Sequence, residues 1–513
     1  MEHKNAIKLY NTLTKSSNQF KPLDNKMIKM YVCGPTVYDF AHIGNARSFV
    51  IYDILYRILR YVYGSKNVLY VRNITDLDDK INNKAKDTGK SIHEVTSITI
   101  ANFWKDMDYI KCFKPNVEPK ATDHIEEMVE IIEKLLASNH AYIQNNTVYF
   151  KVNKCDFYYD LSKRNRNQML SGSRIDIDHT KENSEDFVLW KPGNDEDDPS
   201  ALFESPWGIG KPGWHIECSA MSYKYCGSDF DIHGGGVDLV FPHHTNEIAQ
   251  SRCAFPGSKY AHTWIHNGFL TVNKTKMSKS LGNFITVRDM INKGFRGEVI
   301  RYFLLSAHYR KPLDYNDKAI SDAQLSLNNL YAATKIIDES LDEEALLDFF
   351  DTLDITDFIN IMCDDMNTPK AFAYLHSILR EINAIDLQVK KDHNDHTNDK
   401  STDVLYDREI KNNTDKFNIL KTKKLYLACK IKKCANFLGL LQQTYKQWFH
   451  EDSSSDENID DSTRSWIDKM LNERNIAKKA KQYHIADDIR KELDNKGFVV
   501  TDTTDGSIVT RKK

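Results

Sequence analysis

The sequence lacks any apolar run of the roughly 18 residues that a membrane-spanning helix needs, so a membrane span is excluded. Residues 1–20 lack the apolar stretch of a secretory signal, and none is expected. Net charge is almost absent, since 70 basic residues against 73 acidic ones give −3. Any surface that binds nucleic acid must therefore be local and not a property of the whole molecule.

A disulfide framework is also missing. The nine cysteines are odd in number and irregularly spaced along 513 residues. This pattern favours reduced thiols in the cytoplasm, a few of them binding metal. With 41% hydrophobic and 28% charged residues, the composition is that of a globular protein with a sizeable core. The length predicts about three to four domains.

The first readable unit alternates between strand and helix. Residues 27–33 form a mostly apolar run closed by Gly34-Pro35, which predicts a buried strand. Apolar residues at helical spacing follow between 49 and 62, and residues 67–71 predict a second buried strand. Together they predict a right-handed βαβ unit of a parallel sheet. Such sheets bind ligands at the carboxyl ends of their strands, which here are marked by Cys33, the loop 36–45 and Thr75.

Composition shifts divide the rest of the chain. A module at 115–205 appears inserted into the α/β region, with a helix at 124–139 and a strand at 147–152. Beyond 317 the pattern is mostly helical to 450, and we interpret the polar segment near 390–416 as a solvated, mobile insert. The remaining segments are an acidic linker at 451–462 and a basic C-terminal domain at 463–513, whose 12 basic and 8 acidic residues give +4.

Four residues have the types that zinc prefers. His243 and Glu247 are four residues apart, so they share one face of a helix, and His244 with Glu247 is an alternative pair. Cys33 and Cys218 would complete a tetrahedral shell of sulfur, nitrogen and oxygen. Spacing alone leaves open the alternative of separate buried cysteines and a surface His/Glu pair.

Two strings suit phosphate. His42-Ile43-Gly44-Asn45 stands just before the first long helix, whose free N–H groups would attract an anion. Lys276 and Lys279 lie three residues apart in a loop of small polar residues, where two ammonium groups would meet charge developing on a triphosphate. The alternatives are an N-cap asparagine at 45 and an ordinary exposed loop.

A glycine run at 233–238 ends in Asp238, which is free to hold an ammonium group. The run lacks the G-x-G-x-x-G spacing of a dinucleotide site, so no nicotinamide or flavin is expected. A tight turn is the alternative interpretation.

The string at 42–45 resembles the HIGH signature, and residues 276–280 are an intact KMSKS signature. Together, in this order, the two strings are similar to those of class I aminoacyl-tRNA synthetases. Longer strings resemble the cysteinyl-tRNA synthetase family over nearly the whole chain. They are YVCGPTVYDFAHIGNARS (31–48), VRNITDLDDKI (71–81), GWHIECSAM (213–221), HGGGVDLVFPHHTNEIAQS (233–251), DMNTPKA (365–371) and ERNIAKKAKQYHIADDIRKEL (473–493).

The resemblance implies an α/β fold. We expect a Rossmann-type parallel-sheet catalytic domain split by an insertion, then a helical bundle and a small C-terminal anticodon-binding domain. The expected ranges are 1–114 and 206–275 for the two catalytic halves, 115–205 for the insertion, 276–316 for the KMSKS loop and stem-contact region, 317–450 for the bundle, 451–462 for the linker and 463–513 for the C-terminal domain.

The resemblance also implies the site residues. The family's single Zn²⁺ falls on Cys33, Cys218, His243 and Glu247, which selects His243 over His244, and the family coordinates the substrate thiolate to that ion. Residues at cysteine-framing positions are Thr75, Trp214 and Asp238. ATP-binding positions are His42, Gly44, Asn45, Lys276 and Lys279, and of these His42, Asn45 and the two lysines are the implied catalytic residues.

Two positions depart from the family pattern. The last histidine of the HIGH signature is Asn45 here, which donates a hydrogen bond but carries no charge. A tryptophan that many members have near the C-terminus is absent from 506–511, which leaves the anticodon contacts open.

The implied reaction joins L-cysteine to ATP, with Mg²⁺, to give cysteinyl-adenylate and pyrophosphate, and then transfers cysteine to the 3′ end of tRNA(Cys). A cytoplasmic monomer is expected. Lysines in the helical region would meet tRNA phosphates; they are Lys421, Lys423, Lys424, Lys430, Lys432 and Lys433. Trp466 and Tyr483 are candidates to stack anticodon bases, although core positions are the favoured interpretation of both.

Three rival functions remain at this point. A ligase could adenylate cysteine and pass it to a small amine, but the segment 473–493 favours tRNA. A zinc hydrolase would leave KMSKS unexplained and lacks HExxH spacing. A non-catalytic RNA-binding protein would have no use for Lys276 and Lys279.

Overall fold

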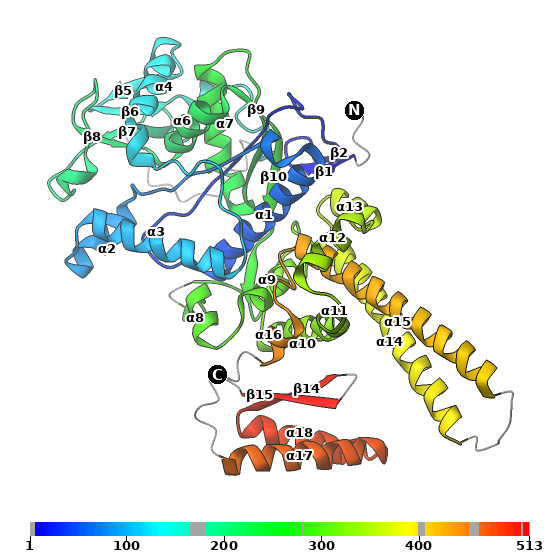
Figure 1. Ribbon diagram of the computed structural model, residues 1–513. Helices are drawn as coiled ribbons and strands as arrows, with labels where there is room; N and C mark the ends of the chain where they lie inside the picture. The colour runs from blue at the N-terminus through cyan, green and yellow to red at the C-terminus, as the bar shows by residue number, and fades with distance from the viewer. Residues whose placement is uncertain are drawn as a thin grey trace. The chain divides into compact units, whose positions relative to one another are not determined.

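The computed structural model describes residues 6–164, 181–278, 281–398, 406–450, 461–503 and 506–511 (Figure 1). These form two compact units. Unit 1 comprises Met1–Asp289, Ala307–Tyr315 and Met362–Asn367, and unit 2 comprises Met290–Ser306, Asn316–Ile361 and Thr368–Lys513.

Unit 1 begins with an antiparallel hairpin and then builds the predicted βαβ motif. The hairpin pairs β1 (Lys8–Asn11) with β2 (Ser16–Gln19). Strand β3 (Ile28–Val32) leads through α1 (Ile43–Tyr63) to β4 (Val68–Arg72), and β3 and β4 pair in parallel. The strand, helix and strand expected from apolar periodicity are confirmed. Helix α1 begins six residues earlier than the periodic apolar positions, because residues 43–48 are part of it as well.

The central sheet of unit 1 is parallel and has the order β10-β9-β3-β4. Strand β9 spans Asp229–Gly236 and β10 spans Tyr260–Asn267. The chain leaves β3 toward β4 on one side and later returns to add β9 on the other side. The carboxyl ends of β3 and β9 therefore meet at the point where the strand order reverses, which is where open α/β sheets bind ligands.

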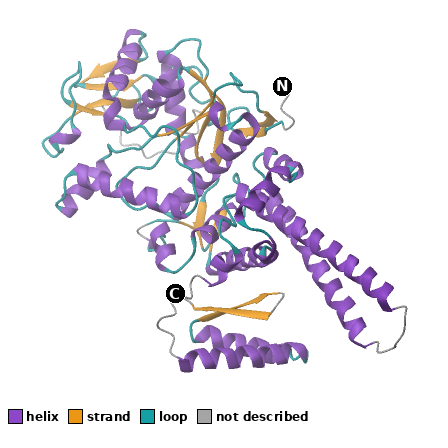
Figure 2. Cartoon of the chain, viewed as in Figure 1, coloured by secondary structure: helices purple, strands orange, loops and turns teal. Residues whose placement is uncertain are grey.

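Helices cover this sheet (Figure 2). Helix α6 (Trp214–Cys226) precedes β9, and α7 (His243–Ala254) lies between β9 and β10. An apolar core of unit 1 joins the sheet to these helices and to the inserted module, and it includes Tyr31, Phe230, Trp264, Ile248 and Trp190. A site built from α6, α7 and the strand ends is thus carried by closely packed elements.

The inserted module is a helix with a small antiparallel sheet. Helix α4 (Ile125–Ala137) is followed by a sheet of order β5-β6-β7-β8. Its strands are β5 (Ala141–Gln144), β6 (Thr147–Phe150), β7 (Phe187–Pro192) and β8 (Gly210–Pro212). The helix and strand expected at 124–139 and 147–152 are confirmed. Between β4 and this module lie α2 (Asp79–Thr88) and α3 (Ile92–Tyr109).

A buried arginine anchors the segment that leads to the KMSKS loop. Arg47 on α1 donates to the carbonyl oxygens of Gly268 at 2.9 Å, Phe269 at 2.7 Å and Lys311 at 2.6 Å. These acceptors flank a sheet of order β12-β11-β13, formed by β11 (Leu270–Val272), β12 (Thr275–Lys276) and β13 (Leu313–Tyr315). Arg47 therefore joins α1 to the strands that lead to Lys276.

Unit 2 is a helical bundle organised around a buried carboxylate. Glu298 on α9 (Gly297–Leu305) accepts from the Tyr331 hydroxyl at 2.9 Å and from the amides of Leu441 at 2.7 Å and Gln442 at 3.2 Å. The other helices are α8 (Val287–Asn292), which begins in unit 1, α10 (Asp317–Ala333), α11 (Lys335–Ser340), α12 (Glu343–Thr352), α13 (Thr356–Cys363), α14 (Thr368–Asn398), α15 (Tyr406–Phe437) and α16 (Tyr445–His450).

The segment 390–416, which we interpret as a solvated, mobile insert, is helical over most of its length. Residues 390–398 continue α14 and 406–416 begin α15, so these parts lie on two long helices that run side by side in Figure 1. Residues 399–405 are outside the described part. Low apolar content alone therefore does not exclude a helix, and the mobility of the insert stays a prediction.

The C-terminal segment of unit 2 has its own small core. Helices α17 (Asp461–Lys479) and α18 (Tyr483–Asn495) are followed by the antiparallel pair β14 (Phe498–Thr503) and β15 (Gly506–Arg511). Met470, Ile489, Leu493, Phe498 and Val500 are buried there, and Trp466 packs against them half-buried. The favoured core position of Tyr483 is wrong, since this side chain is 61% exposed.

All nine cysteines are free thiols and all are buried, which confirms the expectation of a chain without a disulfide framework. Within the described ranges, no helix combines the length and apolar character needed to cross a membrane.

We predict that Arg47→Met lowers the free energy of unfolding of unit 1 by about 3 kcal/mol or more, because buried carbonyl acceptors lose their donor. Urea unfolding followed by tryptophan fluorescence measures this loss. Lys66→Met is the matched control, since Lys66 is exposed. An equal midpoint for the two variants would contradict the anchoring role of Arg47.

Candidate metal centre and active site

The four predicted zinc ligands lie together in unit 1. The ligand atoms of Cys33, Cys218, His243 and Glu247 are all within 4.8 Å of one another, and all four residues are buried. The two Sγ atoms are 3.8 Å apart, Cys33 Sγ is 3.7 Å from Glu247 Oε1, and His243 Nε2 is 3.1 Å from the same oxygen.

Three elements bring these ligands to one point. Cys33 directly follows β3, Cys218 lies in α6, and His243 and Glu247 are one turn apart on α7. The sheet order places β3 next to β9, and α6 and α7 are the helices before and after β9. Ligands separated by 185 residues in the chain therefore converge because of one strand pairing.

A second overlapping set comprises Cys33, His233, His244 and Glu247. In this set His233 Nε2 is hydrogen-bonded to Glu247 Oε2 at 2.8 Å, and His244 Nδ1 is bonded to His266 Nε2 at 2.7 Å. His244 Nε2 lies 3.3 Å from Cys33 Sγ. This set offers one sulfur, whereas the set with Cys218 and His243 offers two.

Two hydrogen bonds hold the Glu247 carboxylate on the side that faces away from the sulfur atoms. Glu247 Oε2 accepts from His233 at 2.8 Å and from the Tyr260 hydroxyl at 2.9 Å, which leaves Oε1 facing the two sulfur atoms. His243 is oriented similarly, because its Nδ1 is 2.9 Å from His215 Nδ1 while Nε2 faces Glu247. Such outer hydrogen bonds fix the orientation of metal ligands. Sequence reasoning missed His215, His233 and Tyr260.

The electrostatics of the cluster suit a cation. Burial raises the pKa of the Cys33 thiol, and its hydrogen bond to Cys218 lowers the pKa of that second thiol to about 6. Burial would also raise the pKa of Glu247, but His233 and His243 outweigh it and hold this pKa below the ordinary value. The set thus gathers one carboxylate, one acidified thiol, a second thiol and an imidazole in a dry interior, and these donor types fit the ligand chemistry of Zn²⁺.

The HIGH-like string caps helix α1. His42 is the N-cap residue, and its Nδ1 accepts from the backbone N–H of Asn45 at 3.1 Å. A Cβ atom added to Gly44 would lie 2.9 Å from that same ring nitrogen, so the backbone passes too close for a larger residue. Since the N–H groups of Ile43, Asn45 and Ala46 have partners of their own, the attraction of this helix end for an anion rests on its partial positive charge and on the close backbone approach that Gly44 allows.

The KMSKS loop follows β12 and returns to the HIGH-like string. The backbone N–H of Ile43 donates to Ile285 at 3.0 Å, and the ring of His42 lies edge-on against Phe284 at 5.1 Å. Lys276 is exposed, and its carbonyl oxygen accepts from Asn283 Nδ2 at 3.2 Å. Lys279 lies outside the described residues.

The three predicted cysteine-binding residues occupy different surroundings. Thr75 is 3% exposed, whereas Trp214 is 43% exposed and its ring centre lies 4.3 Å from that of His243. Asp238 is exposed in a short turn after β9. A cavity of about 280 Å³ opens beside Trp214 and is lined by His215, Glu217, Leu77, Asp78, Asp79, Asn82, Phe187, Val188, Lys191, Lys211, Pro212 and Gly213.

Comparison with known proteins decides the family. The pattern described as the tRNA synthetases class I (C) catalytic domain matches residues 19–325, and the DALR domain matches 357–406. A cysteine–tRNA ligase of Ehrlichia ruminantium (strain Gardel) is 49% identical over 500 residues, covering 97% of this chain and 98% of its own length.

The chain belongs to the cysteinyl-tRNA synthetase family. A second relative named cysteine–tRNA ligase, from Rickettsia bellii (strain OSU 85-389), is 47% identical and covers 99% of this chain and 100% of its own length. The family resemblance inferred from the sequence strings is confirmed.

A solved structure shows the same fold at low sequence identity. Methionyl-tRNA synthetase of Mycobacterium tuberculosis, in complex with methionyl-adenylate, has a TM-score of 0.54 at 16% identity, covering 84% of this chain and 93% of its own. With the parallel sheet of unit 1, this confirms the expected α/β class of the cysteinyl-tRNA synthetase.

We predict that Cys218→Ser removes most of the bound zinc, because an alcohol is a harder ligand that rarely loses its proton. Elemental analysis of the purified protein measures the zinc content. Cys226→Ser is a matched control, because Cys226 is buried at the other end of α6 and outside both ligand sets. Full zinc in Cys218→Ser would contradict the ligand assignment.

Proposed function

We propose that this protein activates L-cysteine with ATP and transfers it to the 3′ end of tRNA(Cys). The observation that carries the proposal is the buried set of two thiols, an imidazole and a carboxylate at the carboxyl ends of β3 and β9. This set lies in the catalytic domain of a chain whose close relatives are named cysteine–tRNA ligases.

Zinc fits the four ligands that we propose for it, Cys33, Cys218, His243 and Glu247, because two sulfur donors favour this metal over Mg²⁺ or Ca²⁺. When bound, the ion would coordinate the substrate sulfur as a thiolate. Serine differs from cysteine by one atom, and a pocket that reads shape separates near-isosteres only about 10- to 200-fold. Zinc would instead distinguish the two side chains by the acidity of the thiol and the softness of its sulfur. This difference supplies the larger discrimination that protein synthesis needs.

Adenylate formation needs positioning and charge stabilisation. The cysteine carboxylate attacks the α-phosphorus of ATP and displaces pyrophosphate, so negative charge grows on the phosphate oxygens. We assign the neutralising contacts to Lys276, Lys279, His42 and the N-terminus of α1, with Asn45 and Gly44 beside the phosphates and Mg²⁺ accompanying ATP. Asn45 supplies a hydrogen bond without charge.

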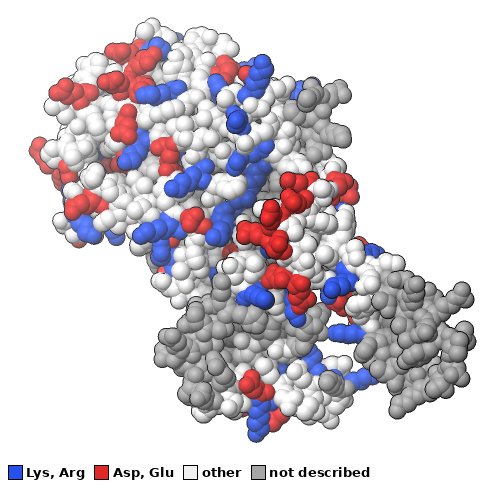
Figure 3. All heavy atoms as spheres, viewed as in Figure 1, with Lys and Arg blue, Asp and Glu red and all other residues white. Residues whose placement is uncertain are grey.

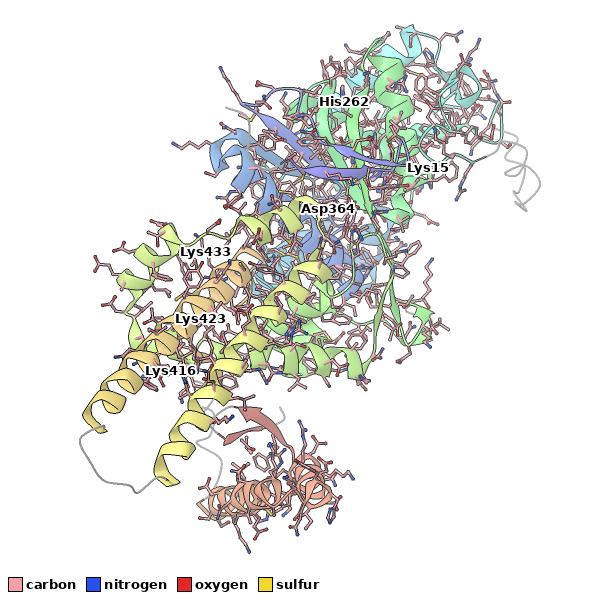
Figure 4. The ribbon with its side chains drawn as sticks, turned by 90° about the vertical axis from the view of Figure 1, so that its right-hand side faces the viewer. Lys15, His262, Asp364, Lys416, Lys423 and Lys433 are labelled. Atoms are coloured by element: carbon pink, nitrogen blue, oxygen red, sulfur yellow. The ribbon has the colours of Figure 1, made fainter. Side chains whose placement is uncertain are left out.

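The tRNA contacts belong to local surfaces. The face seen in Figure 3 carries side chains of both signs, Lys and Arg as well as Asp and Glu. Along α15, Lys423 is exposed, and we assign it a contact with the tRNA phosphates (Figure 4). Lys433 is unsuited to phosphate binding, because it donates to the carbonyl oxygens of Phe350 and Leu353, the latter at 2.8 Å.

Other lysines of the predicted set are also engaged. Lys432 donates to the Gln443 carbonyl oxygen at 2.7 Å, and Lys424 pairs with Asp386 at 2.5 Å. Tyr483 is exposed on α18, and it is available to stack a base. We also expect the working enzyme to be a cytoplasmic monomer.

The reaction is tested by ATP–pyrophosphate exchange. We predict exchange with L-cysteine and a roughly 10⁴-fold lower kcat/KM with L-serine, and loss of cysteine-dependent exchange when a chelator removes the metal. Restoring zinc is the control for damage by the chelator. Comparable exchange with serine, or an unchanged rate without metal, would contradict the proposal.

The role of the C-terminal segment is tested by removing 463–513. Because this segment has a core of its own, we predict that exchange stays within about threefold of the full chain while aminoacylation of tRNA(Cys) falls at least about tenfold. Equal loss of both activities would show that this segment supports the catalytic domain instead of reading tRNA.

A further inference from the structure

A buried ion pair joins α3 to the segment that follows the KMSKS loop. Arg288 is the second residue of α8, and its Nη2 atom lies 2.7 Å from Asp106 Oδ1 on α3. The Asp106 side chain is fully buried, whereas that of Arg288 is 31% exposed. Both residues belong to unit 1, so this contact lies within one compact unit.

The Asp106 carboxylate depends on this guanidinium. Among the described residues, neither of its oxygens has a hydrogen-bond partner, so the attraction of the opposite charge is what offsets its burial. Burial raises the pKa of Asp106 to about 6, and Arg288 acts in the opposite direction. Because the loss of the guanidinium would leave a buried charge without a partner, Asp106 retains Arg288 at this position.

Helix α3 provides a firm support for the pair. Phe103 lies one turn before Asp106 and packs edge-on against Phe49 of α1, with the ring centres 5.1 Å apart. Both phenylalanines are buried, and so is Met107, the residue after Asp106. The carboxylate is thus fixed relative to α1, the helix whose N-terminus carries the HIGH-like string.

The residues just before Arg288 lie against the HIGH-like string. Thr286 forms an antiparallel bridge with His42, and the backbone N–H of Val287 donates to the Ala41 carbonyl oxygen at 3.0 Å. Since Arg288 directly follows Val287, its position sets where this backbone lies beside His42.

The same segment is tied to the start of the KMSKS loop. Asn283 accepts from the backbone N–H of Ser278 at 2.9 Å and donates to the Lys276 carbonyl oxygen at 3.2 Å. A displacement of Arg288 would therefore be passed to the backbone of Lys276 as well as to the contacts with the HIGH-like string.

We propose that Asp106 and Arg288 are positioning residues for adenylate formation, because their ion pair holds the KMSKS loop in register with the HIGH-like string. The inference rests on the proposed function, in which both strings contact ATP. Neither residue is assigned a contact with a substrate, so the pair acts through the backbone of residues 285–287.

The kinetics of ATP–pyrophosphate exchange by the zinc-loaded full-length enzyme test the proposal. Misplacing reacting groups by about 1 Å can lower a rate about 100-fold, so we predict that Asp106→Asn and Arg288→Met each lower kcat about 10-fold or more. The affinity for L-cysteine, measured by calorimetry, should stay within about twofold, since the proposed metal ligands lie on other elements.

Two further variants separate positioning from simple damage. Arg288→Lys keeps the charge and should recover part of the rate that Arg288→Met loses. The double variant Asp106→Asn with Arg288→Met should be no slower than the slower single variant, because the two changes remove the same contact.

Amide hydrogen exchange followed by mass spectrometry gives a second readout that needs no activity. We predict faster hydrogen exchange of residues 285–287 in Asp106→Asn, because the hydrogen bond between Val287 and Ala41 opens more often. Absence of cysteine-dependent pyrophosphate exchange in the unmodified enzyme would defeat the proposed function, whereas the hydrogen-exchange readout would still test the pair.

Arg57→Met is the matched control. Arg57 pairs at 2.8 Å with the buried Asp53 further along α1, and we predict that its loss leaves kcat within about twofold. An unchanged kcat in Asp106→Asn, an equal fall in the control, or an equal loss of cysteine affinity would overturn the proposal. Losses that add in the double variant would also overturn it, because the two residues would then act separately.

Discussion

Two thiols, one imidazole and one carboxylate are buried within a few ångströms of one another, and a bound cation would stabilise such a set. Without a cation, the two sulfur atoms and the Glu247 oxygen compete for protons in a dry interior, which is visible in the opposite pKa shifts of Cys33 and Cys218. Binding energy at such a site is also folding energy, because it ties β3, α6 and α7 together.

The parallel sheet brings the residues of this cluster together and places them next to the proposed phosphate site. Reversal of the strand order between β3 and β9 opens the carboxyl edge of the sheet, where Cys33 and the loop before α1 emerge. The same loop presents His42 at the start of a helix, so the proposed metal site and the proposed phosphate site share one edge of one sheet. Arg47, one turn along that helix, fixes the backbone that leads to Lys276.

Local sequence patterns predicted the helices and strands, whereas the distances between side chains came only from the structure. Apolar periodicity was sufficient for β3, α1 and β4, because these buried elements repeat with the period of their geometry. The same reasoning did not predict the helical residues within 390–416, because the sequence there has few apolar residues to form a repeat. The hydrogen bonds of His233 and Tyr260 to Glu247 join positions 13 to 14 residues apart through tertiary packing, and no short-range pattern reports them.

The family resemblance and the structure supplied different information about the candidate site. The strings around Cys33, Cys218, His243 and Glu247 implied a ligand set, and the structure brings these atoms together beside a competing set that contains His244. His215, His233 and Tyr260, which contact the proposed ligands His243 and Glu247, have no distinctive spacing in the sequence. Only the folded chain brings them to the cluster.

The central claim is that the metal binds the sulfur of the substrate directly. X-ray absorption at the zinc edge, recorded on the zinc-loaded enzyme before and after addition of L-cysteine, tests it without relying on activity. The account predicts two sulfur ligands in the free enzyme and one more at about 2.3 Å when cysteine is bound. A sulfur shell that does not change on binding cysteine, under conditions in which binding is saturated, would contradict it.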